Sequence, residues 1–215
     1  MQKFYASLKA PPAPRSIAVM NPYKDARAME YTAAFLDKFF ADNNPRTLIF
    51  GINPGRFGAG ITGITFTDPV ALADFCGIPN HLPRRRELSS VFVYDVIAAL
   101  GGPAAFYSRF MLTAICPLGF TRKDVNLNYY DVKTLEKAVT PFIVKSVETH
   151  LAIGGKRDRA VILGNGKNAH YLRKLNEKHG FFDEIVALEH PRFILQYRRK
   201  RVTEYIDKYT RALAG

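Results

Sequence analysis

The hydrophobic residues of this chain form four short apolar runs, and longer segments with apolar residues at helical spacing lie between them. The apolar runs cover residues 47–51, 110–115, 160–163 and 184–188. Each run has the length and the continuous hydrophobicity of a buried parallel strand. The segments of helical spacing cover residues 23–43, 69–76, 88–100, 133–151, 167–178 and 196–213. Strands and helices are therefore expected to alternate along most of the chain.

This alternation predicts an α/β fold with a parallel sheet and helices on both of its faces. No internal repeat and no long linker divides the sequence, so residues 1–215 are predicted to form one domain. Residues 1–22 contain four prolines and are expected to form an extended lead-in. The polar segment 121–131 is expected to be a loop.

The binding site of such a fold lies beyond the carboxyl ends of its strands. The first predicted strand leads into Asn53-Pro54 and the last into His190-Pro191. A following proline restricts the backbone at each of these polar residues. An Asn before Pro is commonly a turn former, and a single His is commonly a structural hydrogen-bonding group. Because both follow strand ends, we expect Asn53 and His190 to share one edge as a candidate functional pair.

The charge of the chain favours a polyanionic partner. Lys and Arg number 31 against 19 Asp and Glu, which gives a net charge of +12 and a pI near 9.8. Basic residues cluster at 84–86, 156–159 and 198–201. Such clusters bind phosphates by releasing counterions, so a nucleic acid is the favoured partner. An acidic protein and a lipid surface remain alternatives on charge alone.

Several other classes of protein lack support. Two cysteines, Cys76 and Cys116, are too few for a disulfide scaffold or a four-cysteine metal site. No H-E-x-x-H or C-x-x-C motif occurs either, so no metal site is expected. The glycine pattern of residues 58–63 does not lead directly from a strand into a helix, as a dinucleotide site requires. We find no apolar run of 18 residues and no signal peptide. An intracellular, soluble protein without a membrane partner is therefore expected.

The segment from Gly51 to Phe66, GINPGRFGAGITGITF, matches the pattern G-M-N-P-G-P-F-G-x-x-x-T-G-x-P-F without a gap. With this segment, the chain resembles the single-strand-selective monofunctional uracil-DNA glycosylases, a branch of the uracil-DNA glycosylase superfamily. The similarity continues, in the same order, through Asn21-Pro22, Cys116-Pro117-Leu118, Leu163-Gly164-x-Gly166 and His190-Pro191.

The resemblance implies a three-layer αβα sandwich around a short, mainly parallel sheet of four strands. It implies an enzyme that flips a damaged base out of DNA and hydrolyses its N-glycosidic bond, without a cofactor or a metal. DNA, single- or double-stranded, would be the partner of a monomeric protein. The enzyme would be found in the cytoplasm, at the bacterial nucleoid, or in the nucleus of a eukaryote.

The resemblance also assigns roles to residues. Asn53 would position the hydrolytic water, and His190 would stabilise the departing base anion. Phe66 would stack on the flipped base. The remaining base-binding positions would be Ile52, Gly55, Phe57 and Ala114.

Two further segments are expected to contact DNA. Gly164, Asn165, Gly166 and Lys167 precede a predicted helix, whose N-terminal N–H groups attract phosphate, although a plain strand-to-helix turn is an equal alternative. After His190-Pro191, a loop is expected to present Arg192, Phe193 and Ile194 to DNA, with Arg198 nearby. Large apolar residues there would fill the gap that an extruded base leaves, or they would pack inward.

The chain departs from the family pattern at two places. Ala114 stands where the relatives usually have Asn, and Arg192-Phe193 stands where they have Ser-Pro. A glycosylase for the deaminated purines xanthine and hypoxanthine is therefore one alternative to a uracil enzyme. A non-catalytic nucleic-acid-binding module on the same fold is the other.

Overall fold

A computed structural model describes residues 1–214, and four parallel strands form the centre of the protein. The strands are β2 (Arg46–Gly51), β3 (Phe110–Ala114), β6 (Gly155–Leu163) and β7 (Glu184–Leu188), in the order β3-β2-β6-β7. The register pairs Gly51 with Ala114 and Leu163 with Leu188 at the carboxyl ends. These four ends therefore lie at one edge of the sheet, as predicted.

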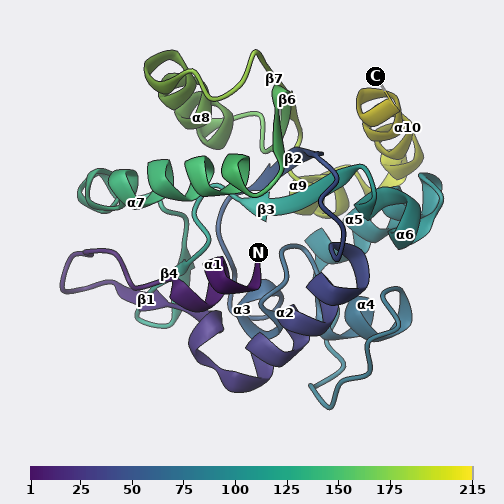
Figure 1. The fold of residues 1–215 in the computed structure, drawn as a ribbon, viewed down its shortest axis with the longest axis horizontal. Coiled ribbons are helices and arrows are strands. Elements are labelled where there is room, and N and C mark those ends of the chain that lie inside the picture. Colours follow the sequence, from purple (N-terminus) through teal and green to yellow (C-terminus); the bar gives the residue numbers. More distant parts are fainter. Residues whose placement is uncertain (215) are drawn as a thin grey trace.

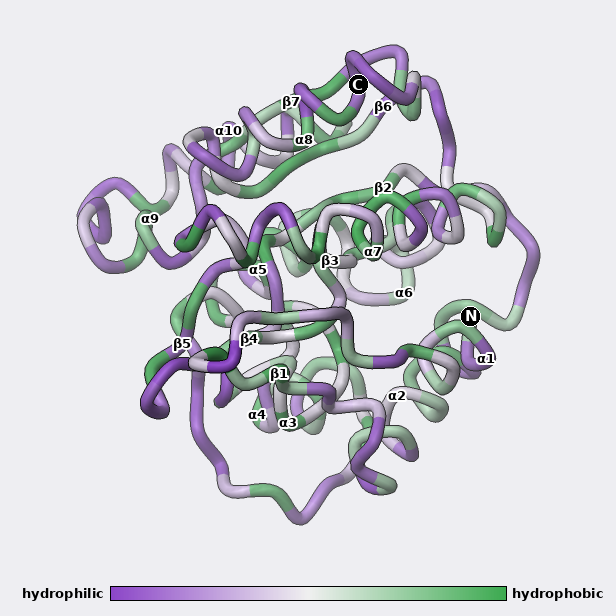
Figure 2. Tube along the Cα trace, turned by 90° about the vertical axis from the view of Figure 1, so that its left-hand side faces the viewer, coloured by the Kyte–Doolittle hydropathy of each residue, from purple (hydrophilic) through white to green (hydrophobic). Residues whose placement is uncertain are grey.

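Helices cover both faces of this sheet, which confirms the predicted three-layer α/β architecture (Figure 1). The helices α7 (Lys133–Ala152) and α8 (Lys167–His179) lie on one side. The other side is covered by α5 (Leu88–Ala99), α6 (Gly102–Tyr107) and α10 (Val202–Ala214), whose side chains pack with Ile49, Leu112 and Val161 of the strands. Figure 2 shows β2 as an apolar stretch, as burial on both faces requires, whereas β6 is polar at its exposed beginning and apolar and buried from Ala160 to Leu163.

A second, antiparallel sheet corrects the expectation of a loop at residues 121–131. It consists of β1 (Ala18–Met20), β4 (Gly119–Arg122) and β5 (Val125–Leu127), with β4 between the other two. These strands have only three or four residues, too few for an alternating pattern to be recognised. Ala18 of β1 pairs with Thr121 of β4, a contact that only the folded chain brings about.

The amino-terminal segment is not the extended lead-in that was expected. It contains α1 (Gln2–Ser7) and β1, and Tyr5 of α1 is buried with its ring 4.7 Å from that of Tyr23. The predicted helix 23–43 is divided into η1 (Pro22–Lys24) and α2 (Ala26–Phe39). The helices α3 (Ala59–Thr62) and α4 (Pro69–Asp74) follow β2.

Residues 192–195, expected to be a loop, are helical, and the helix predicted over 196–213 is divided among three elements. Residues 191–201 form α9 (Pro191–Tyr197) and η2 (Arg199–Arg201), and α10 follows directly. Pro191 occupies the first turn of α9, where its missing N–H costs nothing. Gly215, the last residue of the predicted domain, lies outside the described residues. Among residues 1–214, no helix is both long and apolar enough to cross a bilayer.

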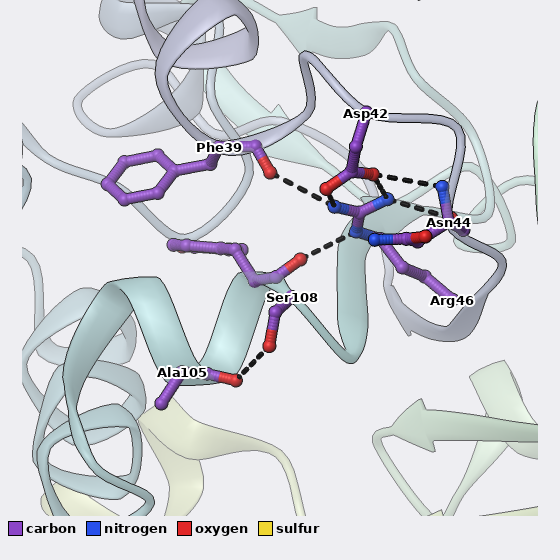
Figure 3. A network of polar contacts seen from close by, with 7 residues as sticks. Phe39, Asp42, Asn44, Arg46, Ala105 and Ser108 are labelled. Atoms are coloured by element: carbon purple, nitrogen blue, oxygen red, sulfur yellow. Dashed lines mark hydrogen bonds and ion pairs between the residues drawn. The ribbon is translucent and has the colours of Figure 1, made fainter.

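The buried guanidinium of Arg46 anchors the beginning of the central strand (Figure 3). Arg46 is 1% exposed. Its Nε donates to the Tyr107 carbonyl at 2.6 Å, and its Nη atoms donate to both oxygens of Asp42 at 2.8 and 3.0 Å. Further bonds reach the carbonyls of Phe39 and Asn44. One cation therefore joins the ends of α2 and α6 to β2, and its hydrogen bonds hold the pKa of the Asp42 carboxyl below its usual value.

Replacing Arg46 by Met should lower the free energy of unfolding by about 3 kcal/mol, because buried carbonyls lose their donor. Urea unfolding at pH 7 measures this change. The exposed Arg84, paired with Asp74 at 2.8 Å, provides the control: Arg84→Met should cost less than about 1 kcal/mol. Equal effects of the two substitutions would contradict the anchoring role of Arg46.

A buried histidine makes the stability of the fold depend on pH. His150 on α7 donates from Nδ1 to the Ser146 carbonyl at 2.7 Å, and its Nε2 lies 2.8 Å from the Thr113 hydroxyl of β3. Burial lowers its pKa from 6.5 to about 4. The folded protein therefore holds His150 neutral between these two pH values, whereas the unfolded chain takes up a proton.

Because the folded-state pKa is the lower one, stability should be complete above about pH 6.5 and decline as the pH falls toward about 4. The contribution of His150 to this decline is about 1.4 kcal/mol per pH unit. Unfolding free energies measured at several pH values should show a smaller slope for His150→Gln than for the wild type. The exposed-site variant His81→Gln should keep the wild-type slope, and a wild-type slope in His150→Gln would refute the assignment.

Candidate active site

A cavity of about 360 Å³ opens at the carboxyl edge of the central sheet. Asn53, which follows β2, and His190, which follows β7, both line it. Ala114 at the end of β3 and Phe66 from the loop after α3 complete the wall. The parallel order of the strands thus brings together two residues that are 137 positions apart in the sequence.

The Asn53 side chain is fixed mainly by the main chain at the end of β5 and just beyond it. Its Nδ2 donates to the Leu127 carbonyl at 3.1 Å and, more weakly, to that of Pro54 at 3.4 Å. Its Oδ1 accepts the N–H of Tyr129 at 3.0 Å. Both N–H groups are therefore engaged with protein, and only acceptor capacity on Oδ1 remains for a ligand or a water.

Asn168 joins the ends of the strands behind the cavity, and sequence reasoning missed it. Its Oδ1 accepts a bond from the Tyr129 hydroxyl at 2.8 Å, and its Nδ2 lies 3.4 Å from the carbonyls of Gly51 and Leu163. The Tyr129 main chain in turn holds Asn53. A buried network of this kind fixes the geometry of the site because every polar group in it needs its partner.

His190 is held as a neutral imidazole with a defined tautomer. Its Nδ1 accepts the N–H of Arg192 at 3.2 Å and so caps the N-terminus of α9. The proton of the neutral ring therefore resides on Nε2, which makes His190 a hydrogen-bond donor in the cavity. Burial, and then the charge of Arg192, lowers the pKa of His190 to about 4, so the ring is neutral near pH 7.

The ring of Phe66 lies directly over the end of β2. A Cβ atom on Gly51 would lie 2.8 Å from Phe66 Cε2, so a side chain larger than hydrogen does not fit at Gly51. Phe66 itself has φ +56°, a strained conformation that costs about 1–2 kcal/mol for a residue other than glycine. Its ring centre lies 6.0 Å from that of His190. The surrounding structure therefore maintains this aromatic wall at an energetic cost.

The other residues expected to bind a base occupy different positions. Ile52, Gly55 and Ala114 line the cavity, and Ala114 presents no polar group there. Phe57 is not part of its wall. The ring of Phe57 instead stacks beneath the guanidinium of Arg85, 3.7 Å from the ring centre, and also contacts Arg56. Phe57 thus secures the basic segment 84–86 beside the cavity.

An adjoining cavity of about 430 Å³ contains the residues expected to bind phosphate. Its wall includes Gly164, Asn165, Gly166 and Lys167 at the start of α8, together with Arg198. Ile52, His190 and Phe193 line both cavities. The two hollows therefore adjoin at His190, and the second contains Lys167, Arg198 and the N-terminus of α8.

The residues of α9 divide into an inward and an outward set. Ile194 is 0% exposed and belongs to the core, so the expectation that it contacts DNA is wrong. The reason is helical geometry, which turns successive residues away from one another. Arg192, Phe193 and Tyr197 are exposed and line the mouth of the first cavity. Phe193 and Tyr197 have ring centres 5.5 Å apart, and Arg198 lies 5.3 Å from the Phe193 ring.

Sequence reasoning missed Leu127, Tyr129, Glu87 and Tyr197, all of which hold or line the first cavity. For Leu127 and Tyr129, the available signal was the polar segment 121–131, which contains asparagines and lies between two apolar elements. Within residues 1–214, no group of three or more His, Cys, Asp or Glu side chains is arranged to hold a metal ion.

Comparisons with known proteins agree with this architecture. Residues 38–214 match the family model described as the uracil DNA glycosylase superfamily. The structure is also similar to the crystal structure of wild-type Pedobacter heparinus SMUG2, with a TM-score of 0.96 and 46% sequence identity. This match covers 99% of the present chain and 94% of that protein. A comparison with curated proteins gave no match.

The hydrogen bonds of Asn53 disfavour an ionised carboxylate at this position. In Asn53→Asp, one oxygen would face the Leu127 carbonyl, so the carboxyl pKa should rise and the ionised form should destabilise the fold by about 1–3 kcal/mol. Unfolding free energies measured at pH 7.5 and pH 5 test this expectation. The deficit relative to the wild type should shrink at pH 5, because the protonated carboxyl donates to Leu127; a deficit equal at both pH values would contradict it.

Proposed function

The chain belongs to the uracil DNA glycosylase superfamily, and on this premise we propose that it hydrolyses the N-glycosidic bond of a damaged base in DNA, uracil first. The chain is a DNA glycosylase by family. The observation that carries the finer proposal is the shared cavity, in which Asn53, His190 and Phe66 surround a space of about 360 Å³. Extruding a base from DNA costs a few kcal/mol, which stacking and phosphate contacts offset.

His190 stabilises the base as it leaves. Breaking the C1′–N bond places negative charge on the base, and a preorganised donor facing that charge contributes several kcal/mol. The bond from the Arg192 N–H to Nδ1 leaves the His190 proton on Nε2. With a pKa of about 4, the imidazole donates a hydrogen bond without transferring its proton.

Asn53 positions the hydrolytic water. Its N–H groups are bound to main-chain carbonyls, so its Oδ1 accepts a hydrogen bond from the water in a fixed direction. Holding the water within reach of C1′ removes much of the entropic cost of attack. No covalent nucleophile is required, since departure of the base leaves a sugar with oxocarbenium character.

Ala114 favours a second candidate substrate within the same reaction. It lies on the cavity wall, is 4% exposed and presents only a methyl group, so no side chain at this position reads one edge of uracil. A cavity of about 360 Å³ also falls within the usual range of small-molecule sites, about 300–1,000 Å³. The deaminated purines xanthine and hypoxanthine are therefore proposed as further substrates.

DNA contacts the surface around these cavities. Gly166 and Lys167 at the start of α8 bind a phosphate, supported by Arg198 in the same hollow. Phe193 and Tyr197, 39% and 61% exposed at the cavity mouth, fill the gap left by the extruded base. The protein acts as a monomer in this proposal.

Oligonucleotides that contain uracil, xanthine or hypoxanthine test the function. The wild type should produce alkali-labile abasic sites, and His190→Ala should lower the single-turnover rate by about 10²–10³-fold. Asn53→Ala should also be strongly impaired. His179→Ala, which alters an exposed histidine at the far end of α8, is the matched control and should keep the wild-type rate. The proposal fails if the wild type leaves every oligonucleotide intact, and the role of His190 fails if His190→Ala matches the control.

A further inference from the structure

Glu87 is the only acidic side chain among the described residues that line the first cavity. It occupies the N-cap position of α5, next to the basic segment 84–86. Asn53 and His190 line the same cavity. The structure therefore places one carboxylate in a space that otherwise contains only neutral and basic groups.

The loop after β2 is shaped to accommodate this carboxylate. A Cβ atom on Gly58 would overlap Glu87 Oε2, and a Cβ atom on Gly55 would lie 3.5 Å from Oε1. The distance at Gly55 is an ordinary contact, so it is Gly58 that allows Glu87 to pack against the backbone of the segment that begins with Asn53. Any side chain at Gly58 would displace the carboxylate.

The main chain of Glu87 is fixed, while its carboxylate is left unpaired. Its N–H donates to Asp68 Oδ2 at 2.7 Å, and its carbonyl accepts the N–H of Val91 at 2.9 Å. Across residues 1–214, no hydrogen bond or ion pair engages the Glu87 carboxylate oxygens. A half-buried carboxylate without a partner is available for a ligand or a water in the cavity.

Asp68, the acidic residue closest to the Gly51–Phe66 segment in the sequence, has a different role. It is 1% exposed, and its two oxygens accept the N–H groups of Ala71 and Glu87. Asp68 therefore caps α4 and positions the main chain of Glu87, without reaching the cavity. Asn53 does not supply a base either, because an amide does not take up a proton near neutral pH.

We propose that Glu87 is a further catalytic residue, which accepts the proton of the attacking water and whose negative charge stabilises the cationic sugar. This inference rests on the proposed function. The water oxygen forms a bond to C1′ while the C1′–N bond breaks, and the electron pair of that bond stays on the base. One proton of the water passes to the Glu87 carboxylate, and solvent then carries it to the departed base.

The surroundings of Glu87 suit this role. Burial, followed by the charge of Asp68, raises the pKa of Glu87, while Arg192 from α9 and Arg85 from the neighbouring segment oppose the rise. A raised pKa makes a carboxylate a stronger base. The two arginines keep a negative charge tolerable in a partly buried position.

The substitution Glu87→Gln tests the inference because it keeps the shape of the side chain and removes its charge. The single-turnover rate should fall by about 10²-fold for every base that the wild type excises. The acidic limb of the pH–rate profile that belongs to Glu87 should disappear. Asp124→Asn is the control: it also removes one negative charge, from a side chain that is 96% exposed. This control should retain the wild-type rate and profile.

Binding of abasic-site analogues provides a readout that does not depend on turnover. DNA with a cationic pyrrolidine in place of the sugar mimics the oxocarbenium ion, and DNA with a tetrahydrofuran is its neutral counterpart. The wild type and Asp124→Asn should prefer the pyrrolidine DNA. For Glu87→Gln, this preference should be about tenfold smaller than for the wild type, while its affinity for the tetrahydrofuran DNA should equal that of the wild type. Thermal unfolding of the variant checks that the fold is intact.

Three results would overturn the role of Glu87 while leaving the glycosylase function standing. The first is a Glu87→Gln rate within threefold of the wild type. The second is an unchanged preference for the cationic analogue. The third is a loss confined to one base, since that would make Glu87 a reader of the base. A wild type that excises no base would overturn the proposed function and this inference together.

Discussion

Two main-chain hydrogen bonds to the Asn53 amide connect the segment after β2 to the end of β5, and the geometry of the cavity depends on them. Leu127 accepts from one end of the amide and Tyr129 donates to the other. Tyr129 is bound in turn to Asn168, which contacts the ends of β2 and β6. The amide is therefore oriented before any ligand arrives, and the arrangement admits an amide but opposes a carboxylate. Because the Asn53 amide does not take up a proton near neutral pH, another side chain must accept the proton of the water in the proposed reaction.

The side chains around the cavity differ in charge, and each charge suits a different role in the proposed reaction. His190 is a neutral donor because the Arg192 N–H occupies Nδ1 and burial depresses the pKa of the ring. Glu87, at the start of α5, packs against the loop after β2 and carries the only negative charge among the described residues of the wall. The cationic residues Lys167 and Arg198 lie in the adjoining hollow, which we propose as the phosphate site. The Glu87 carboxylate and these two cations thus lie in neighbouring but distinct hollows.

The strands of the central sheet could be predicted because burial on both faces leaves a continuous apolar run. Parallel pairing then required the ends of β2 and β7 to share an edge, and so Asn53 and His190 were expected together before any coordinates. The short strands β1, β4 and β5 escaped prediction because each is shorter than one clear period of alternation. A loop was predicted for residues 192–195, which form part of α9, and this wrong prediction placed the buried Ile194 on the surface.

The sequence by itself determined the layer order, the superfamily motif from Gly51 to Phe66, and the two polar residues that face the cavity. Those features follow from local periodicity and from contiguous motifs, which a linear pattern records. Only the tertiary structure decided that Leu127 and Tyr129 hold Asn53, and that Glu87 reaches the same cavity from a polar segment. Their positions depend on how distant segments pack together, and no periodicity around these residues encodes that packing.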